Sequence, residues 1–326
     1  MMRSITTAAR AALALLLATL TCAPSARAAD TVTVGTVGSP SANLWPIFIG
    51  LDKGFFAAEG LKIDLVYVQS SAAVIQQLAA GALHMAVSNG LVDPVRAIDQ
   101  GAALAIARFE VQAPPYAMTA KASIKSLKDL KGKIIAVGGA KDITRIYAER
   151  MLGPNGLKSG DYDYWFAGAT TARAQALLSG AVDAALLLPP SNFQVQANGY
   201  SDLGLTIQYA PELPFSGTSV GRAWAAANAS VLRRVLAAQS KAIDYFYDDR
   251  NRAEAVRILV AVSGLKPDEV EKSYDFFRKN DFFDRTGKIA RPKMNALLDA
   301  LVSLGDLSAR GNPERFLLPG VAQLSD

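Results

Sequence analysis

The sequence has few of the residues that carry out nucleophilic, redox or metal chemistry. Of its 326 residues one is cysteine, Cys22, and one is histidine, His84. It also has no HExxH signature. An enzyme of the common hydrolytic classes needs a nucleophile, a base or a metal cluster. The composition therefore argues against an enzyme, and we expect no catalytic residue, no metal site and no cofactor.

Strong charge of one sign and long apolar runs are also missing. The chain has 34 Lys and Arg against 29 Asp and Glu, with no basic block of the kind that binds nucleic acid. Beyond the N-terminal region no stretch is long and apolar enough to span a bilayer. With 51% hydrophobic residues, the chain is instead long enough to build two hydrophobic cores without disulfides.

The first 28 residues have the pattern of a secretory signal peptide. Arg3 and Arg10 precede the apolar run at 11–20, and Ala26-Arg27-Ala28 fits a small-x-small cleavage site. Thr21 precedes Cys22, where a lipid-carrying cysteine normally follows Gly, Ala or Ser, so we do not expect a lipoprotein. Cleavage after residue 28 would leave 31 basic and 29 acidic side chains in an exported, soluble protein.

One sequence pattern occurs twice, 99 residues apart. LAAGALHMAVSNG at 78–90 aligns with LLSGAVDAALLLP at 177–189, so that Gly81 matches Gly180. Upstream, Ser71 matches Thr170 and could cap an Ala/Leu-rich helix in each copy. The pattern predicts a helix, a glycine turn and a buried strand in each of two related lobes, although Ala/Leu-rich helices also resemble one another by chance.

The first part of the chain alternates strand and helix patterns. We expect a helix from Trp45–Pro46 to about Glu59, ended by Gly60. This β-α-β rhythm predicts a largely parallel sheet with helices on both faces. The remaining expected elements are strands at 31–38, 61–68, 83–88 and 103–110, and helices at 71–80 and 93–100.

Two proline-containing segments suggest that the chain crosses between lobes twice, at 112–123 and within 209–230. Residues 218–226 are a candidate strand that returns to the first lobe. Between the crossings we expect strands at 134–137, 164–167 and 203–208, and a helix at 142–152. Helices at 230–248, 252–263, 267–279 and 291–304 complete the chain. The predicted domains are 30–112 with 216–326 for lobe 1 and 113–215 for lobe 2.

Sheets of this kind bind ligands beyond the carboxyl ends of their strands. This rule selects residues 37–43, Ser88 with Asn89, and 108–110, although such residues also satisfy the backbone of ordinary turns. Gly138-Gly139 comes between a strand and a helix start, where exposed N–H groups form an anion site. Lys141 would add a positive charge there; the alternative is a plain tight turn.

Four segments together resemble a known family. GLDKGFFAAEGLKIDLVYV (50–68), AAGALHMAVSN, SIKSLKDLKGKIIAV (123–137) and SGAVDAALLLPP are similar to solute-binding proteins of ATP-driven importers for nitrate, sulfonates, taurine and thiamine-precursor pyrimidines. The resemblance covers roughly residues 30–310. His84 departs from the pattern, because the family often has Asp at that position.

The resemblance implies a two-lobed α/β periplasmic-binding-protein fold (type II), with two crossing segments and a ligand cleft that closes by a hinge. It also implies a periplasmic monomer that delivers a small-molecule ligand to the membrane permease of an ABC importer with its cytoplasmic ATPase. The site residues expected from strand ends and from the resemblance are Ser39, Asn43, Trp45, Ser88, Asn89, Arg108, Glu110, Gly139, Lys141, Asp142, Thr144, Thr170, Pro189, Phe193, Phe215 and Arg222.

The sequence does not determine the identity of the ligand. Lys141, Arg108 and Arg222 favour a carboxylate or sulfonate, whereas Glu110 and Asp142 favour an amine or a pyrimidine. Aromatic walls from Trp45, Phe193 or Phe215 would suit an aromatic body. We expect a binding protein for a small anion; the alternatives are binding of a thiamine-type pyrimidine precursor, a periplasmic enzyme, or a sensor that signals to a membrane receptor.

Overall fold

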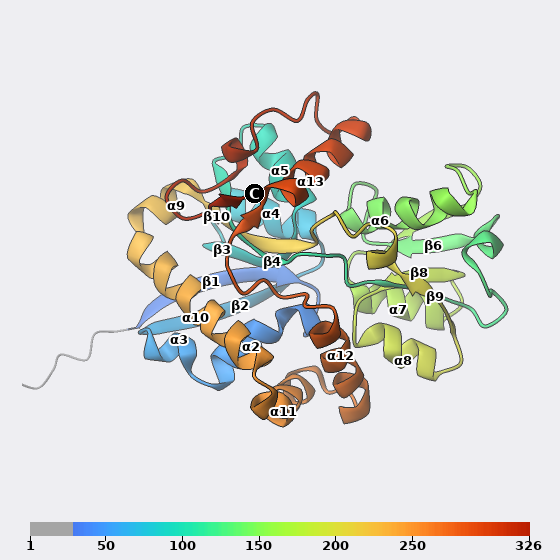
Figure 1. Ribbon diagram of the computed structural model, residues 1–326, viewed down its shortest axis with the longest axis horizontal. Helices are drawn as coiled ribbons and strands as arrows, with labels where there is room; N and C mark the ends of the chain where they lie inside the picture. The colour runs from blue at the N-terminus through green and yellow to red at the C-terminus, as the bar shows by residue number, and fades with distance from the viewer. Residues whose placement is uncertain (1–28) are drawn as a thin grey trace, which may run out of the picture.

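The computed structural model describes residues 29–326, so the predicted signal peptide and Cys22 lie outside the described residues. Two separate five-stranded sheets, each flanked by helices, form two lobes (Figure 1). The strand order is β2-β1-β3-β10-β4 in the first lobe and β7-β6-β8-β5-β9 in the second. The two-lobed α/β fold expected from the sequence is therefore confirmed.

The first sheet is mixed. Its strands are β1 (Asp30–Val37), β2 (Leu61–Val68), β3 (Met85–Gly90), β4 (Leu104–Val111) and β10 (Ser216–Gly221). β1 pairs in parallel with β2 and β3, but β10 enters between β3 and β4 and is antiparallel to both. The expected parallel sheet thus holds for the consecutive strands, and the returning segment supplies the antiparallel one.

The helix expected at about 45–59 is broken. A 3-10 turn (Ala42–Leu44) leads into α2 (Trp45–Asp52), and α3 (Phe55–Ala58) follows after Gly54, whose φ of +68° ends the helical run. The other helices of this part are α4 (Ser71–Ala79) and α5 (Val92–Asp99). The expected caps are shifted by one residue, because Ser70 caps α4 and Ala169 is the cap residue of α7.

The second sheet contains β5 (Ala117–Ala120), β6 (Ile134–Val137), β7 (Asp163–Phe166), β8 (Ala184–Leu187) and β9 (Ser201–Leu205). Its helices are α6 (Ile143–Leu152), α7 (Thr170–Leu178) and α8 (Ser191–Ala197). β5 was not expected as a strand, since Pro114-Pro115 masked the pattern just before it. This strand is fully buried between β8 and β9 and antiparallel to both.

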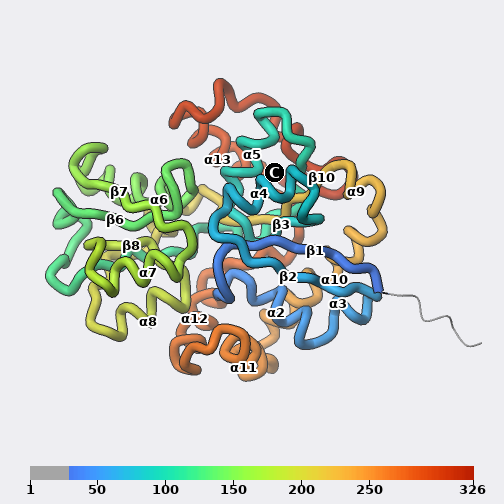
Figure 2. The backbone as a smooth tube through the Cα atoms, turned by 180° about the vertical axis from the view of Figure 1, so that it is seen from behind, coloured from blue at the N-terminus to red at the C-terminus, as the bar shows by residue number. Residues whose placement is uncertain are grey.

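Two connections join the lobes, one between β4 and β5 and the other between β9 and β10 (Figure 2). After β10 come α9 (Arg222–Ala227), α10 (Ala229–Tyr247), α11 (Arg252–Ser263), α12 (Pro267–Lys279) and α13 (Arg291–Ser303). The helices α10 and α11 pack on α2, and α12 also reaches α8 of the second lobe. No helix among residues 29–326 is long and apolar enough to cross a membrane.

The repeated pattern has the same structural role in both lobes. His84 N donates to Thr33 O at 2.9 Å, and Thr33 N donates back to His84 Nδ1 at 3.0 Å. At the matching place in the second lobe, Asp183 N donates to Ile134 O at 2.8 Å and Ile134 N donates to Asp183 Oδ2 at 3.0 Å. His84 and Asp183 therefore join equivalent strands, which explains why His84 can stand where the family often has Asp.

Candidate functional site

A cavity of about 60 Å³ lies between the lobes, where strand ends and helix starts of both meet. Its lining is rich in hydroxyl groups. The polar residues that line it are Ser39, Ser41, Asn43, Ser70, Ser71, Ser88, Asp142, Thr170, Thr171, Arg173 and Ser191. Tyr116 and Phe215 add aromatic surface. The cavity therefore suits a small polar ligand that contacts both lobes.

Arg173 is the cation of this cavity. It lies in the first turns of α7, is 3% exposed, and its guanidinium carbon lies 5.6 Å from the centre of the Tyr116 ring. Nε donates to Leu186 O and Nη2 to Thr170 Oγ1, both at 2.8 Å, while Nη1 donates to Gly168 O. These bonds use three of its five N–H groups, and the guanidinium also interacts with the Tyr116 hydroxyl, so at least one N–H group is left for another acceptor, such as a bound anion.

Helix starts from both lobes face the same cavity. The first-lobe helix α4 begins at Ser71, and Ser70 Oγ accepts from Ala73 N at 3.2 Å. The second-lobe helix α7 begins at Thr170, and its cap residue Ala169 has no side chain that could accept from the first-turn N–H groups. Free N–H groups and the positive end of the helix dipole stabilise anions. Together with Arg173, they make this part of the cavity electropositive.

The first-lobe wall is held by Glu110. Ser88, two residues before the end of β3, has φ of +48°, a conformation that costs energy for a residue with a side chain. Ser88 N donates to Glu110 Oε2 at 2.7 Å, and Ser88 Oγ lies 2.8 Å from the same oxygen. Glu110 also accepts from Thr218 Oγ1 on β10. The carboxylate thus fixes Ser88 at the cavity and joins β4 to β10 next to both connections.

The two lobes touch around the cavity. A Cβ added at Gly38 would lie 2.8 Å from Ala169 Cβ, and one at Gly168 would lie 2.7 Å from Gln69 O. On another side Ala42 N donates to Pro189 O at 3.2 Å, and the rings of Phe193 and Phe276 meet edge to face. The structure therefore shows the lobes closed on each other.

The structure divides the sixteen predicted site residues into two sets. Six line the cavity: Ser39, Asn43, Ser88, Asp142, Thr170 and Phe215. Ten lie outside its lining: Trp45, Asn89, Arg108, Glu110, Gly139, Lys141, Thr144, Pro189, Phe193 and Arg222. Of the second set, Glu110, Pro189 and Phe193 still act at the edges of the cavity through the contacts described above.

The expected anion site at Gly138-Gly139 is occupied by the chain itself. Asp142 caps α6, and its Oδ1 accepts from Thr144 N at 2.9 Å. A Cβ at Gly138 would lie 2.6 Å from the same carboxylate. Lys141 points away and pairs with Asp306 Oδ1 at 3.1 Å. This turn therefore holds a carboxylate of the protein, which corrects its assignment as an anion site.

The two other expected anion partners are also engaged elsewhere. Arg108 Nη1 donates to Ser240 Oγ at 3.1 Å and its Nη2 donates to Asp284 O at 3.0 Å. With Glu110, it faces a separate pocket of about 10 Å³ behind Ser88, the space of one water molecule. Arg222 Nη2 donates to Arg315 O at 2.8 Å. Neither guanidinium reaches the cavity between the lobes.

Trp45 is a core residue and not an aromatic wall of the cleft. It is fully buried, packs on Phe246 and Tyr274, and donates from Nε1 to Ala255 O at 2.7 Å. Asn89 is buried, and its Nδ2 lies 3.4 Å from Gly90 O. Aromatic surface in the cavity comes instead from Phe215, as expected, and from Tyr116, which was not expected.

Arg173 is the main residue of the cavity lining that is absent from the site residues expected from the sequence. The repeat contains a signal for it. At the offset of 99 residues Arg173 matches Val74, which is fully buried in the first lobe. The match predicts that Arg173 is buried as well. A buried arginine is costly unless acceptors pair with it, so such a position indicates a structural or binding role.

Comparison with known proteins identifies the family. The family model "NMT1/THI5 like" matches residues 41–253, well over half of the chain. The chain belongs to the NMT1/THI5-like family. A search of curated proteins finds no significant match.

Solved structures similar to this NMT1/THI5-like chain share its fold at low sequence identity. The alkanesulfonate-binding protein SsuA from Xanthomonas axonopodis pv. citri is 19% identical, with a TM-score of 0.73 over 90% of this chain and 98% of that one. The periplasmic nitrate-binding protein NrtA from Synechocystis PCC 6803 is 15% identical, with a TM-score of 0.70 over 90% and 86%. The desulfurization enzyme DSZB is 14% identical, with a TM-score of 0.66 over 90% and 97%.

The fold of this NMT1/THI5-like chain is thus shared by binding proteins and by an enzyme, and the site must decide between these functions. Among residues 29–326, no group of His, Cys, Asp and Glu side chains is placed to hold a metal ion. His84 lies before β3, accepts from Thr33 N, and stacks on Trp224 with ring centres 5.2 Å apart. The histidine therefore joins strands and is not among the residues that line the cavity.

An acidic residue beside the cavity gives a testable pH dependence. The pKa of Asp93 is raised from 3.8 to about 6, chiefly by burial and also by the negative charge of Asp142 in the other lobe, against the lowering effects of a hydrogen bond from Ser71 and of Arg96. Because folding raises this pKa, the folded protein holds the proton of Asp93 more tightly than the unfolded chain does. The resulting stabilisation is complete below pH 3.8 and is lost as the pH rises through 6.

We therefore expect Asp93→Asn to match the wild type in unfolding free energy near pH 4 and to exceed it above pH 7. The difference should be at most about 3 kcal/mol, because one pKa unit corresponds to about 1.4 kcal/mol. Urea unfolding of both proteins between pH 4 and pH 8 measures it. Parallel stability curves over this range would show that Asp93 titrates normally.

Proposed function

We propose that this protein is the exported solute-binding component of an ABC importer and captures a small organic anion, sulfonate- or carboxylate-like, by closure of its two lobes. The observation that carries the proposal is Arg173, a buried cation with at least one N–H group that the protein itself does not use, in a hydroxyl-rich cavity between the lobes. The start of α7 lies beside it and that of α4 across the cavity, so an anion would receive hydrogen bonds from both lobes.

The size of the cavity favours a compact ligand. It measures about 60 Å³ in the closed structure. An engineered cavity of about 150 Å³ is large enough for benzene. A thiamine-type pyrimidine would require the lobes to stay further apart, whereas a short-chain sulfonate or carboxylate head suits this space. The volume therefore supports the small anion over the heteroaromatic ligand.

Charge within the cavity supports one negative group on the ligand. Of the described residues that line it, Arg173 is the cation and Asp142 the acid. One oxygen of Asp142, Oδ1, accepts from Thr144 N and also from Thr144 Oγ1. The acid thus caps its own helix, which leaves Arg173 to pair with a ligand carboxylate or sulfonate.

The remaining features fit delivery to a membrane complex. Residues 1–28 supply the export signal, the two lobes correspond to 30–112 with 216–326 and to 113–215, and the permease would contact the closed monomer. Binding is favoured over catalysis because residues 29–326 contain no cysteine and their histidine is committed to the β1–β3 connection.

Thermal unfolding in the presence of candidate ligands tests this function. At 100 times its dissociation constant a true ligand should add about 2.7 kcal/mol of stability. We expect this shift with methanesulfonate, taurine, acetate or nitrate, and none with thiamine-type pyrimidines at equal concentration. Stabilisation by the pyrimidines alone would overturn the anion proposal, and chemical turnover of a ligand would overturn the binding function.

A further inference from the structure

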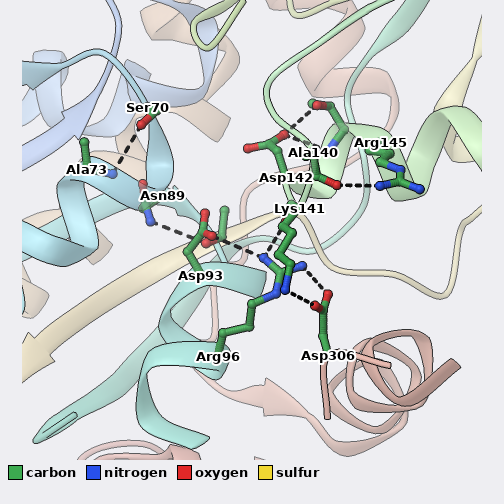
Figure 3. A network of polar contacts seen from close by, with 12 residues as sticks. Ser70, Ala73, Asn89, Asp93, Arg96, Ala140, Lys141, Asp142, Arg145 and Asp306 are labelled. Carbon is green, nitrogen blue, oxygen red and sulfur yellow. Dashed lines mark hydrogen bonds and ion pairs between the residues drawn. The ribbon is translucent and has the colours of Figure 1, made fainter. Parts of the chain in front are cut away.

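A cluster of charged residues joins the lobes outside the ligand cavity. Arg96 on α5 and Asp306, which follows α13, belong to the first lobe, and Lys141 precedes α6 in the second (Figure 3). Lys141 Nζ pairs with Asp306 Oδ1 at 3.1 Å, and Arg96 donates to the backbone oxygen of Lys141. Two independent contacts therefore cross between the lobes at this point.

The first-lobe residues of the cluster also bond to one another. Arg96 Nη2 pairs with Asp306 Oδ2 at 2.6 Å, and Nη1 lies 3.3 Å from Asp93 Oδ1. The side chains of Arg96 and Asp306 are 9% and 8% exposed, whereas that of Lys141 is 71% exposed. A buried carboxylate that Arg96 already holds thus meets one exposed ammonium group from the other lobe. Buried partners lose little entropy when this contact forms.

We propose that Arg96, Asp306 and Lys141 form a clasp that stabilises the closed arrangement of the lobes without touching the ligand. The inference rests on the proposed hinged closure. Any contact present only in the closed state shifts the equilibrium toward closure, and so it slows ligand release. The C-terminal segment that carries Asp306 would then tune affinity from outside the site.

The chain offers a matched control for the exposed lysine. Lys131 pairs with Asp161 at 3.5 Å, and its side chain is 74% exposed, close to the 71% of Lys141. Both partners of this control pair lie in the second lobe, between β5 and β7. Lys131→Met therefore removes an equally exposed charge and ion pair without affecting the contact between lobes.

The experiment measures lobe separation without ligand. Spin labels on cysteines introduced at Lys62 and Lys128, one on each lobe, report the distance distribution in a Cys22→Ser background. We expect Lys141→Met to raise the ratio of open to closed molecules two- to fivefold at low salt, the range typical of an exposed ion pair. High salt should reduce this difference. Lys131→Met should match the parent protein.

A double variant separates the clasp from a general charge effect. With Asp306→Asn present, Lys141→Met should have no further effect on the open-to-closed ratio, because its partner is already lost. Equal distance distributions for Lys141→Met and Lys131→Met would overturn the proposal. Since the readout uses no ligand, failure of every anion to bind would count against the proposed function and leave the clasp measurement unaffected.

Discussion

Replacing Gly38 by alanine should weaken ligand binding about 30-fold or more, although Gly38 bears no functional group. Its added Cβ would lie 2.8 Å from Ala169 Cβ on the opposite lobe, a distance that real Cβ atoms do not adopt. The lobes would then be held apart. A ligand bound to the first lobe alone would lose the hydrogen bonds of Arg173, and such buried charged contacts are typically worth about 2–5 kcal/mol.

Two controls make this result specific. Gly81 has φ of +77°, nearly the +78° of Gly38, but a Cβ there meets nothing within 4 Å. Gly81→Ala should therefore cost the same backbone strain, about 1–2 kcal/mol of folding free energy, with normal ligand affinity. Adding Ala169→Gly to Gly38→Ala removes the clashing Cβ and should restore binding. If affinity stays low in the double variant, the loss comes from a direct contact with the ligand. Isothermal titration with the ligand found by thermal unfolding measures all four proteins.

The order of elements could be predicted from the sequence because local patterns determine it. The glycines at 81 and 180 end helices in both copies, and the apolar runs after them form the buried strands β3 and β8. The strand β5 was not predicted from the sequence, because it follows two prolines and is only four residues long. Its place in the sheet depends on pairing with β8 and β9, which are distant in sequence.

The site could be predicted only in part, because strand ends identify the region and not the side chains that face it. The rule on strand ends selected Ser39, Asn43 and Ser88, which lie in the lining of the cavity. It also selected Arg108, whose side chain bonds to Ser240 and Asp284 O, residues from the C-terminal third of the chain. Likewise Lys141 pairs with Asp306, 165 positions further on. Such long-range partners leave no local pattern.

The charge on the ligand can be tested through Arg173. Arg173→Gln removes the positive charge and the planar fork of donors. It should weaken binding of a sulfonate or carboxylate about 100-fold or more, in line with about 2–5 kcal/mol for a buried charged partner. Arg173→Lys keeps the charge and loses the paired geometry, so we expect a smaller loss of about tenfold. Isothermal titration with the ligand found by thermal unfolding measures both.

Arg173 also supports its own lobe, and the measurement must separate this role from binding. Its bonds to Leu186 O and Gly168 O hold the start of α7, so both variants should lower the unfolding temperature. Titrations well below that temperature compare folded proteins only.

Arg252 lies 5.7 Å from the Tyr274 ring, much as Arg173 lies 5.6 Å from Tyr116, but it is remote from the cavity. Arg252→Gln should leave affinity unchanged. If Arg173→Gln binds the same anion as tightly as the Arg252 control does, the ligand's charge is not recognised by Arg173, and the anion proposal fails at its central residue.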